Sequence, residues 1–283
     1  MKEVLSIVRS EQRPPLIIRN ALVAHAIAYA ADRILKSGIT QEGRELLKTF
    51  IIRACHGGRV SISQELPFVY EGSDLKIEVD GQENIPSWGP SVYVGNHTRG
   101  GPLWNNAQFI EMAKQGYDLR VDVEDEEVRE PFVIMQRGLG GWAIKRYATG
   151  IFYNLAANAL NCEIVSIAKF DKSKINKDGT EITNHQGLSP TAVQRIVDGG
   201  ASLWLPQGTH RDPDDFRFPE NKGTGFLRKI NERNRHVPLV PIRSIPDSRG
   251  NVKIVFGPPV DVGHVVARGG INYFAQYHIK SLS

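Results

Sequence analysis

Residues 91–102 read SVYVGNHTRGGP, and this stretch decides the fold class. Its first half is a β-rich apolar run of strand length, and its second half is a glycine-rich turn that ends at Pro102. Proline suits the first turn of a helix because its φ is already helical and its missing N–H needs no partner there. The stretch therefore predicts a strand over 91–96 and a helix from Pro102 to about Gln115, the beginning of an α/β alternation.

Short strands alternate with helices along the rest of the chain. Further strands are predicted at 75–80, 119–124, 163–170, 201–206, 237–244 and 251–257. Helices are expected between them, including 190–198, which Gly199 and Gly200 close. We therefore predict an α/β domain over residues 75–283, with a central mixed β-sheet flanked by helices.

Residues 1–74 have a different pattern and are predicted to form an N-terminal helical appendage, because their apolar residues recur at helical spacing. Residues 1–59 hold ten Lys or Arg and five Asp or Glu, a surplus of +5 that exceeds the +4 of the whole chain. Two interpretations stay open. The charge belongs to a solvated helical face, or to a face that docks on a membrane surface or an acidic carrier.

The composition excludes several classes of protein. With 283 residues, 41% hydrophobic and 23% charged, the chain is neither disordered nor fibrous. Cys55 and Cys162 are its only cysteines and lack metal-ligand spacing, so we expect no disulfide framework, no metal and a reducing cytoplasm. A pI near 9.0 without a helix-turn-helix, zinc or ribonucleoprotein pattern argues against a nucleic-acid partner.

The sequence also gives an expectation about membranes. The longest uncharged runs are 20–31, 84–98 and 147–162, all shorter than the roughly 20 apolar residues that span a bilayer. The first residues mix acids with arginine where a signal peptide needs an apolar stretch. We expect a cytoplasmic protein whose contact with a membrane, if it has one, is peripheral.

Polar residues follow two of the predicted strands. His97 comes directly after the strand 91–96, and open α/β sheets bind ligands at the carboxyl ends of their strands. An imidazole there could act as a general base toward a hydroxyl, although a hydrogen-bonded structural histidine is the competing interpretation. The stretch SLWLPQGTHRD (202–212) ends in a polar turn around Gly208, whose backbone N–H groups suit a phosphate or an oxyanion.

Two more segments complete the pattern. Residues 222–244 are predicted to contain a glycine-containing segment, then a basic helix, and then an apolar strand that includes Pro238 and Pro241. Residues 252–262 form a strand that ends in Gly-Pro-Pro, which cannot continue a central ladder.

Taken in chain order, these segments resemble the glycerolipid acyltransferase family, the lysophosphatidic-acid and glycerol-3-phosphate acyltransferases, over about residues 76–262. That family has a strand ending in Asn-His within a His-x-x-x-x-Asp motif, a basic residue after a strand, a Phe-Pro-Glu-Gly-Thr-Arg block, a Val-Pro-Ile-Val-Pro-Val strand and a final Gly-Pro-Pro. The resemblance implies transfer of a fatty acyl group from acyl-CoA or acyl-carrier protein to a hydroxyl of a lysophospholipid, glycerol phosphate or related lipid acceptor. It implies no cofactor beyond the acyl donor.

The resemblance also assigns roles to residues. His97 matches the histidine that takes the proton from the acceptor hydroxyl, Lys169 falls where the family keeps a basic residue near the substrate phosphate, and Asn96 and Thr98 flank the histidine. The predicted substrate-binding residues are Asn96, Thr98, Arg99, Lys169, Gln207, Gly208, Thr209, His210, Arg211 and Lys222.

Three family positions differ in this chain. Pro102 stands where the family has the aspartate that orients the imidazole, Gln207 replaces its glutamate, and His210 replaces its arginine. Candidates for a replacement orienting group are a backbone carbonyl or the carboxylates of Asp118, Asp122, Asp212, Asp214 and Asp215. A histidine lacks the two parallel donors with which arginine binds a phosphate, so this replacement weakens phosphate recognition unless other residues supply positive charge. Arg99, Arg211 and Lys222 could supply it. Alternatively, the acceptor carries no phosphate.

Two functions therefore remain. The leading hypothesis is an O-acyltransferase with His97 as general base. The alternative is a catalytically silent relative that binds acyl chains or membrane lipid. A serine hydrolase is disfavoured because the chain has no Gly-x-Ser-x-Gly elbow.

Overall fold

The computed structural model describes residues 17–35, 39–73, 75–96, 102–136, 160, 162–165, 190–206, 216, 224–247 and 251–283. Its helices are α2(Ala21–Leu35), α3(Gln41–Cys55), η2(Leu66–Tyr70), η3(Gln82–Asn84), α4(Pro102–Leu119), α5(Glu126–Arg129), α7(Pro190–Val197), α8(Thr224–Arg233), α9(Val262–Arg268), α10(Ile271–Phe274) and the π-helix η4(Ala275–Ile279). Its strands are β1(Ile77–Asp80), β2(Ser91–Gly95), β3(Phe132–Gln136), β4(Cys162–Val165), β5(Ala201–Trp204), β6(Pro238–Pro246), β7(Val252–Phe256) and β8(Val260–Asp261).

The described strands form one mixed sheet in the order β1-β7-β6-β2-β5-β3-β4, with β8 paired to β6. The five strands from β6 to β4 run parallel to one another. Strands β7 and β8 run antiparallel to β6. The predicted central mixed sheet is confirmed, and the carboxyl ends of β2, β5, β3 and β4 lie at one edge of it.

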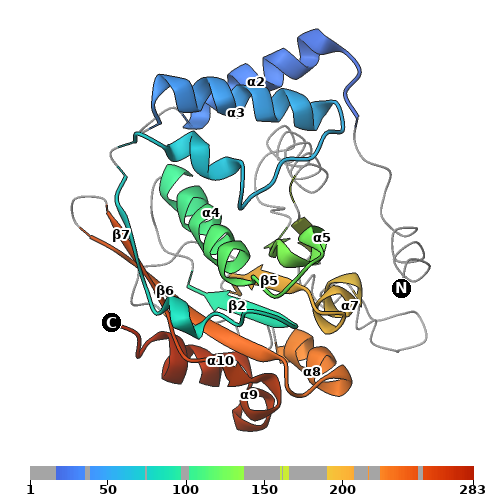
Figure 1. The fold of residues 1–283 in the computed structure, drawn as a ribbon, viewed down its shortest axis with the longest axis vertical. Coiled ribbons are helices and arrows are strands. Elements are labelled where there is room, and N and C mark those ends of the chain that lie inside the picture. Colours follow the sequence, from blue (N-terminus) through green and yellow to red (C-terminus); the bar gives the residue numbers. More distant parts are fainter. Residues whose placement is uncertain are drawn as a thin grey trace, which may run out of the picture.

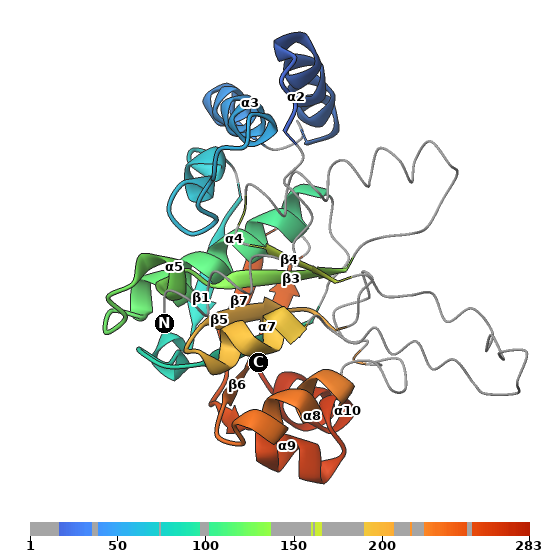
Figure 2. The same ribbon diagram turned by 90° about the vertical axis from the view of Figure 1, so that its right-hand side faces the viewer.

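Helices cover both faces of the sheet (Figure 1, Figure 2). Along β2 the side chains alternate, so Val92 and Val94 enter the core beneath α7, α8, α9 and α10, whereas Tyr93 enters the core beneath α4. All three side chains are fully buried. Burial on both faces explains why the strand reads as a continuous apolar run.

The N-terminal helices lie above α4, on the side of the sheet opposite α9 and α10 (Figure 2). Helix α2 packs on α3, and the buried carboxylate of Asp32 accepts two hydrogen bonds from Arg44, at 2.6 and 2.7 Å. Glu130, just ahead of β3, accepts hydrogen bonds from the hydroxyls of Ser61 and Ser63 at 2.6 and 3.0 Å. The bonds to Glu130 join the helical region to the α/β part of the chain.

Six of the predicted strands have observed counterparts, and the strand expected over 119–124 is wrong. Leu119 is the last residue of α4, and the side chain of Arg120 is fully buried, with its guanidinium donating to the carbonyls of Gly89 and Gly199 at 2.7 and 2.8 Å. These bonds hold the chain in a turn after α4. The strand that completes this part of the sheet is β3, which the sequence analysis missed.

The predicted helices agree better with the structure. Pro102 is the first residue of α4, and α7 begins at Pro190 and is followed by Gly199, whose φ of 106° suits glycine. The basic helix expected within residues 222–244 is α8. Strand β7 ends at Phe256, directly before the Gly-Pro-Pro segment, as predicted.

Candidate active site at the carboxyl edge of the sheet

Two of the predicted motif segments follow neighbouring parallel strands. Strand β2 lies between β5 and β6, with Val94 opposite Trp204 and Gly95 opposite Ile242. His97 is the second residue after β2, and the 207–211 segment begins three residues after β5. Both strands end at the same edge of the sheet, so Asn96 and Pro206, the last described residues before the two segments, follow strand ends at one edge although they are 110 positions apart in sequence.

The predicted basic position, Lys169, follows another strand of the parallel part of the sheet. Strand β4, the outermost of the parallel strands, ends at Val165, four residues before Lys169. Most predicted site residues lie outside the described residues: His97, Thr98, Arg99, Lys169, Gln207, Gly208, Thr209, His210, Arg211 and Lys222. Asn96 is the member of the set that the structure describes.

Asn96 joins the ends of two strands. Its side chain is 2% exposed, its Oδ1 accepts from the Ser244 backbone N–H at 2.7 Å, and its Nδ2 donates to the Ser244 carbonyl at 3.1 Å. The side-chain amide thus imitates a peptide group and extends the parallel ladder between β2 and β6. This geometry favours a role in holding the residue before His97 over direct contact with substrate.

The segment after β5 is also anchored to the C-terminal part of the chain. Phe216 is buried, and the Arg243 guanidinium carbon lies 5.4 Å from the centre of its ring. Arg243 also donates to the backbone carbonyls of Lys280, at 3.0 Å, and Leu282. Gln276 donates to the Phe216 carbonyl at 3.5 Å. The C-terminal part of the chain therefore contacts Phe216, the next described residue after the 207–211 segment.

Two of the carboxylates considered as replacements for the missing aspartate are in the wrong place. Helix α4 starts at Pro102 and has 18 residues, so its far end is about 27 Å away at 1.5 Å per residue. Asp118 lies at that far end, and Asp122 accepts a hydrogen bond from Ser87, ahead of β2, at 2.8 Å. Both carboxylates lie toward the amino ends of the strands. Asp212, Asp214 and Asp215 lie outside the described residues.

Arg120 secures the opposite edge of the sheet and was not singled out from the sequence. Its guanidinium ties Gly89, before β2, to Gly199, before β5, and lies 3.4 Å from the Ser91 hydroxyl. Burial lowers the pKa of Arg120 and raises the pKa of the fully buried Tyr93 beside it. Carbonyl dipoles surround this cation, so it positions the two strands that precede the motif segments.

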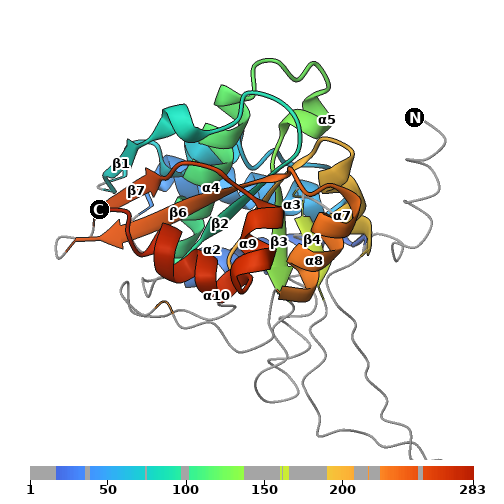
Figure 3. The same cartoon turned by 90° about the horizontal axis from the view of Figure 1, so that it is seen from below.

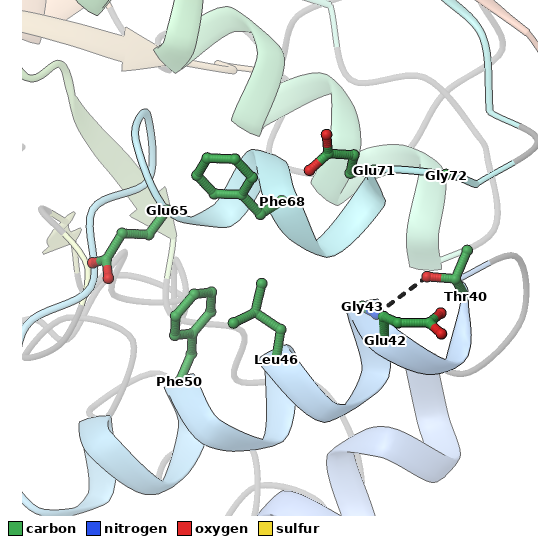
Figure 4. A pocket seen from close by; sticks show the side chains of 9 residues that line it. All are labelled: Thr40, Glu42, Gly43, Leu46, Phe50, Glu65, Phe68, Glu71 and Gly72. Atoms are coloured by element: carbon green, nitrogen blue, oxygen red, sulfur yellow. Dashed lines mark hydrogen bonds between the residues drawn. The ribbon is translucent and has the colours of Figure 1, made fainter.

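A separate groove lies between α3 and η2 in the N-terminal region (Figure 4). It has a volume of about 670 Å³, and Leu46 and Phe50 from α3 face Phe68 from η2 across it. Glu42 and Glu71 are also among the residues that line it. The groove contains none of the predicted site residues. Across the part of the chain that the structure describes, no group of three or more His, Cys, Asp or Glu could hold a metal ion.

Similarity to known proteins is found among solved structures and not among sequences. No protein-family model matches the sequence, and no curated protein matches it. The chain is similar to the crystal structure of the 1-acyl-sn-glycerophosphate (LPA) acyltransferase PlsC from Thermotoga maritima, with 13% identity, a TM-score of 0.44, and coverage of 92% of this chain and 93% of that chain. At 13% identity and a TM-score of 0.44, this similarity assigns no function to the chain. Within the described residues, no helix has the length and hydropathy to cross a bilayer.

Proposed function

We propose that this chain is an O-acyltransferase that moves a fatty acyl group from a thioester donor, acyl-CoA or acyl-carrier protein, to a hydroxyl of a lipid acceptor. The observation that carries the proposal is the parallel pairing of β2 with β5, because these strands precede His97 and the 207–211 segment. The motif that resembles a general base and the motif that resembles an anion-binding turn thus start from one edge of one sheet. Asn96 fixes the end of β2 there.

In the proposed reaction His97 takes the proton of the acceptor hydroxyl as its oxygen attacks the thioester carbonyl carbon. A C–O bond forms, the carbonyl oxygen carries the negative charge of the tetrahedral intermediate, and the C–S bond then breaks. The proton on His97 passes to the departing thiolate. Backbone N–H groups near Gly208 would stabilise the oxyanion, and Lys169, Arg99, Arg211 and Lys222 would hold an anionic acceptor or donor.

The proposal includes contact with a membrane through the helical region of residues 1–74. The outer side of α2 is apolar, with Leu22 80% and Tyr29 59% exposed. Helices of this kind lie in the interface of a bilayer with their apolar side buried. In this arrangement the helical region presents the domain over 75–283 to a lipid acceptor.

A vesicle sedimentation assay tests the membrane contact. The double variant Leu22→Ser, Tyr29→Ser should bind vesicles containing phosphatidylglycerol about tenfold or more weakly, because two apolar side chains no longer enter the bilayer. Trp88→Ser is the matched control, because Trp88 is also exposed, at 71%, but lies just before β2 and not on α2. Equal binding by the double variant and by the wild-type protein would exclude α2 as the contact.

Enzymatic activity is tested by offering both donors to the full chain with a panel of acceptors. The panel contains lysophosphatidic acid, glycerol 3-phosphate and a lysolipid that has a free hydroxyl but no phosphate, and ester products are identified by mass spectrometry. We expect an ester with at least one acceptor. The last acceptor matters because His210 stands where the resemblance predicts a phosphate-binding arginine.

One observation favours the alternative of a silent, lipid-binding relative. Pro102, at the position of the expected aspartate, begins α4, and Asp118 and Asp122 lie too far along the chain to replace it. In serine proteases, neutralising the orienting aspartate lowers turnover by about 10⁴-fold. Lipid that copurifies with the protein, together with no ester product from any donor and acceptor pair, would support this alternative and overturn the enzymatic one.

A further inference from the structure

The helices α8, α9 and α10 form a layer on the face of the sheet away from α2 (Figure 2, Figure 3). Helices α8 and α9 are in contact, and the Gly263 N–H of α9 donates to the Arg235 carbonyl at 3.0 Å. Gln276, at the end of this layer, contacts Phe216 in the segment after β5. The layer therefore adjoins the edge of the sheet from which the proposed active site is built.

This layer is basic. Residues 224–236 and 261–283, which contain these helices, hold six Lys or Arg against two Asp or Glu, a surplus of +4. Four positive side chains have no hydrogen-bond or ion-pair partner among the described residues: Arg228 and Lys229 on α8, Arg235 just after α8, and Arg268 at the end of α9. Arg228, Arg235 and Arg268 are exposed. Unpaired cations of this kind attract an anionic partner without first having to break an ion pair.

An aromatic surface continues the basic one. The rings of Tyr273 and Tyr277 are 4.9 Å apart, and Tyr277 is 67% exposed. Together with Arg268, Asn272 and Gln276 they line an open depression of about 700 Å³. Tyrosine and arginine are enriched among the residues that dominate the energy of protein–protein interfaces. The surface thus combines long-range attraction for acidic groups with aromatic anchors for a close contact.

We propose that the outer face of α8 and α9, with Tyr273 and Tyr277, docks a small acidic protein, and that this protein is the carrier that brings the acyl thioester to the site. The second half of this statement rests on the proposed function. The positive charge of Arg228, Arg235 and Arg268 complements an acidic helical surface, and Tyr277 supplies an apolar contact at its margin.

The position of the layer favours an acidic protein over an anionic membrane. The exposed apolar side of α2 lies on the opposite side of the sheet from α9 and α10 (Figure 1, Figure 2). A molecule that meets a bilayer through α2 turns the α8–α9 face toward water. A lipid acceptor would then arrive from one side and a dissolved donor from the other, with the motif-bearing edge of the sheet between them.

The test measures binding of the full-length protein to purified acyl-carrier protein loaded with a palmitoyl thioester, by fluorescence anisotropy. We expect the charge-reversal variant Arg228→Glu, Arg235→Glu to bind about tenfold or more weakly at low salt, and Arg268→Glu and Tyr277→Ala to weaken binding as well. Affinity of the wild-type protein should fall as salt increases. Lys76→Glu is the control, because Lys76 is an exposed cation directly before β1, the strand at the end of the sheet, and not on the α8–α9 face. This variant should bind the carrier protein as the wild-type protein does.

Binding and turnover are read separately, so the two proposals can fail independently. Absence of carrier binding by the wild-type protein, or equal binding by the charge-reversal variant, overturns the docking surface. Loss of binding to anionic vesicles in that variant, with carrier binding kept, also overturns it and assigns the face to a membrane. Carrier binding that depends on Arg228 and Arg235 without any acyl transfer supports the docking surface and contradicts the enzymatic function.

Discussion

Removing the side chain of Asn96 should cost much more stability than its size suggests. Asn96→Ala deletes two hydrogen bonds, of 2.7 and 3.1 Å, and leaves both backbone groups of Ser244 without their partner in a buried place. Each buried group left unsatisfied costs about 1–3 kcal/mol, so the free energy of unfolding should fall by about 2–6 kcal/mol. Urea unfolding of the two proteins measures this difference.

Asn84→Ala is the matched control because it deletes a single hydrogen bond, from Asn84 Nδ2 to the Phe256 carbonyl at 2.9 Å, in a half-buried place. It should cost about 1 kcal/mol. If Asn96→Ala unfolds within about 0.5 kcal/mol of the wild-type protein, or no more easily than the control, the assignment of Asn96 as the tie between β2 and β6 is refuted.

The variant Asn96→Asp adds a dependence on pH. Its carboxylate can still accept from the Ser244 N–H but faces the Ser244 carbonyl oxygen, so burial and this contact raise the pKa of the new carboxyl in the folded state. A folded-state pKa above the unfolded value means that stability is lost as pH rises. The deficit relative to the wild-type protein should therefore be larger at pH about 7 than at pH about 4.5, and a deficit that grows on acidification would contradict this geometry.

Three further changes test other parts of the structure. Arg120→Met should lower the free energy of unfolding by about 2–4 kcal/mol, because the carbonyls of Gly89 and Gly199 lose their donor; a thermal melt with unchanged midpoint would contradict this. Burial alone would raise the pKa of Glu65, but hydrogen bonds from Arg53 and Ser61 lower it below its usual value. Glu65→Gln should therefore cost about 0.5–1 kcal/mol at neutral pH, and in urea unfolding this cost should shrink below the unfolded pKa near 4.5 and be lost only as pH falls through the lower folded-state pKa. Gly81→Ala should cost about 2–4 kcal/mol in urea unfolding, because φ is 73° and a Cβ would lie 2.0 Å from the Phe256 carbonyl oxygen.

Local pattern was sufficient to predict the strands that are buried on both faces. Residues 91–96 form an apolar run between turn residues, and the run became β2 because both of its sides meet a helical layer. The same reasoning failed at 119–124, where Leu119, Val121 and Val123 alternate as in a strand. Arg120, inside that run, is instead buried and donates hydrogen bonds to the carbonyls of Gly89 and Gly199, which are distant in sequence. A local sequence pattern cannot predict such a contact.

The candidate site was predictable to the extent that it depends on strand ends. A polar turn after a predicted strand marks the carboxyl edge of a sheet, which is why His97 and the 207–211 segment could be selected. The order of strands is set by packing across the whole domain, so the adjacency of β2 to β5 and β6 needed the structure. The role of Asn96 depends on Ser244, 148 residues away, and was likewise outside the reach of local sequence.

In the proposed function, an acyl group is transferred at the carboxyl edge of this sheet with His97 as general base. The most direct test is kcat/KM for ester formation by His97→Ala, measured with the best donor and acceptor pair and compared with the wild-type protein and with His56→Ala, an exposed histidine at the end of α3. General-base catalysis predicts that His97→Ala lowers kcat/KM by about 10²–10⁴-fold and unfolds at the wild-type midpoint. His56→Ala should keep the wild-type kcat/KM. A kcat/KM of His97→Ala within about twofold of the wild-type value would contradict the assignment of His97 as general base.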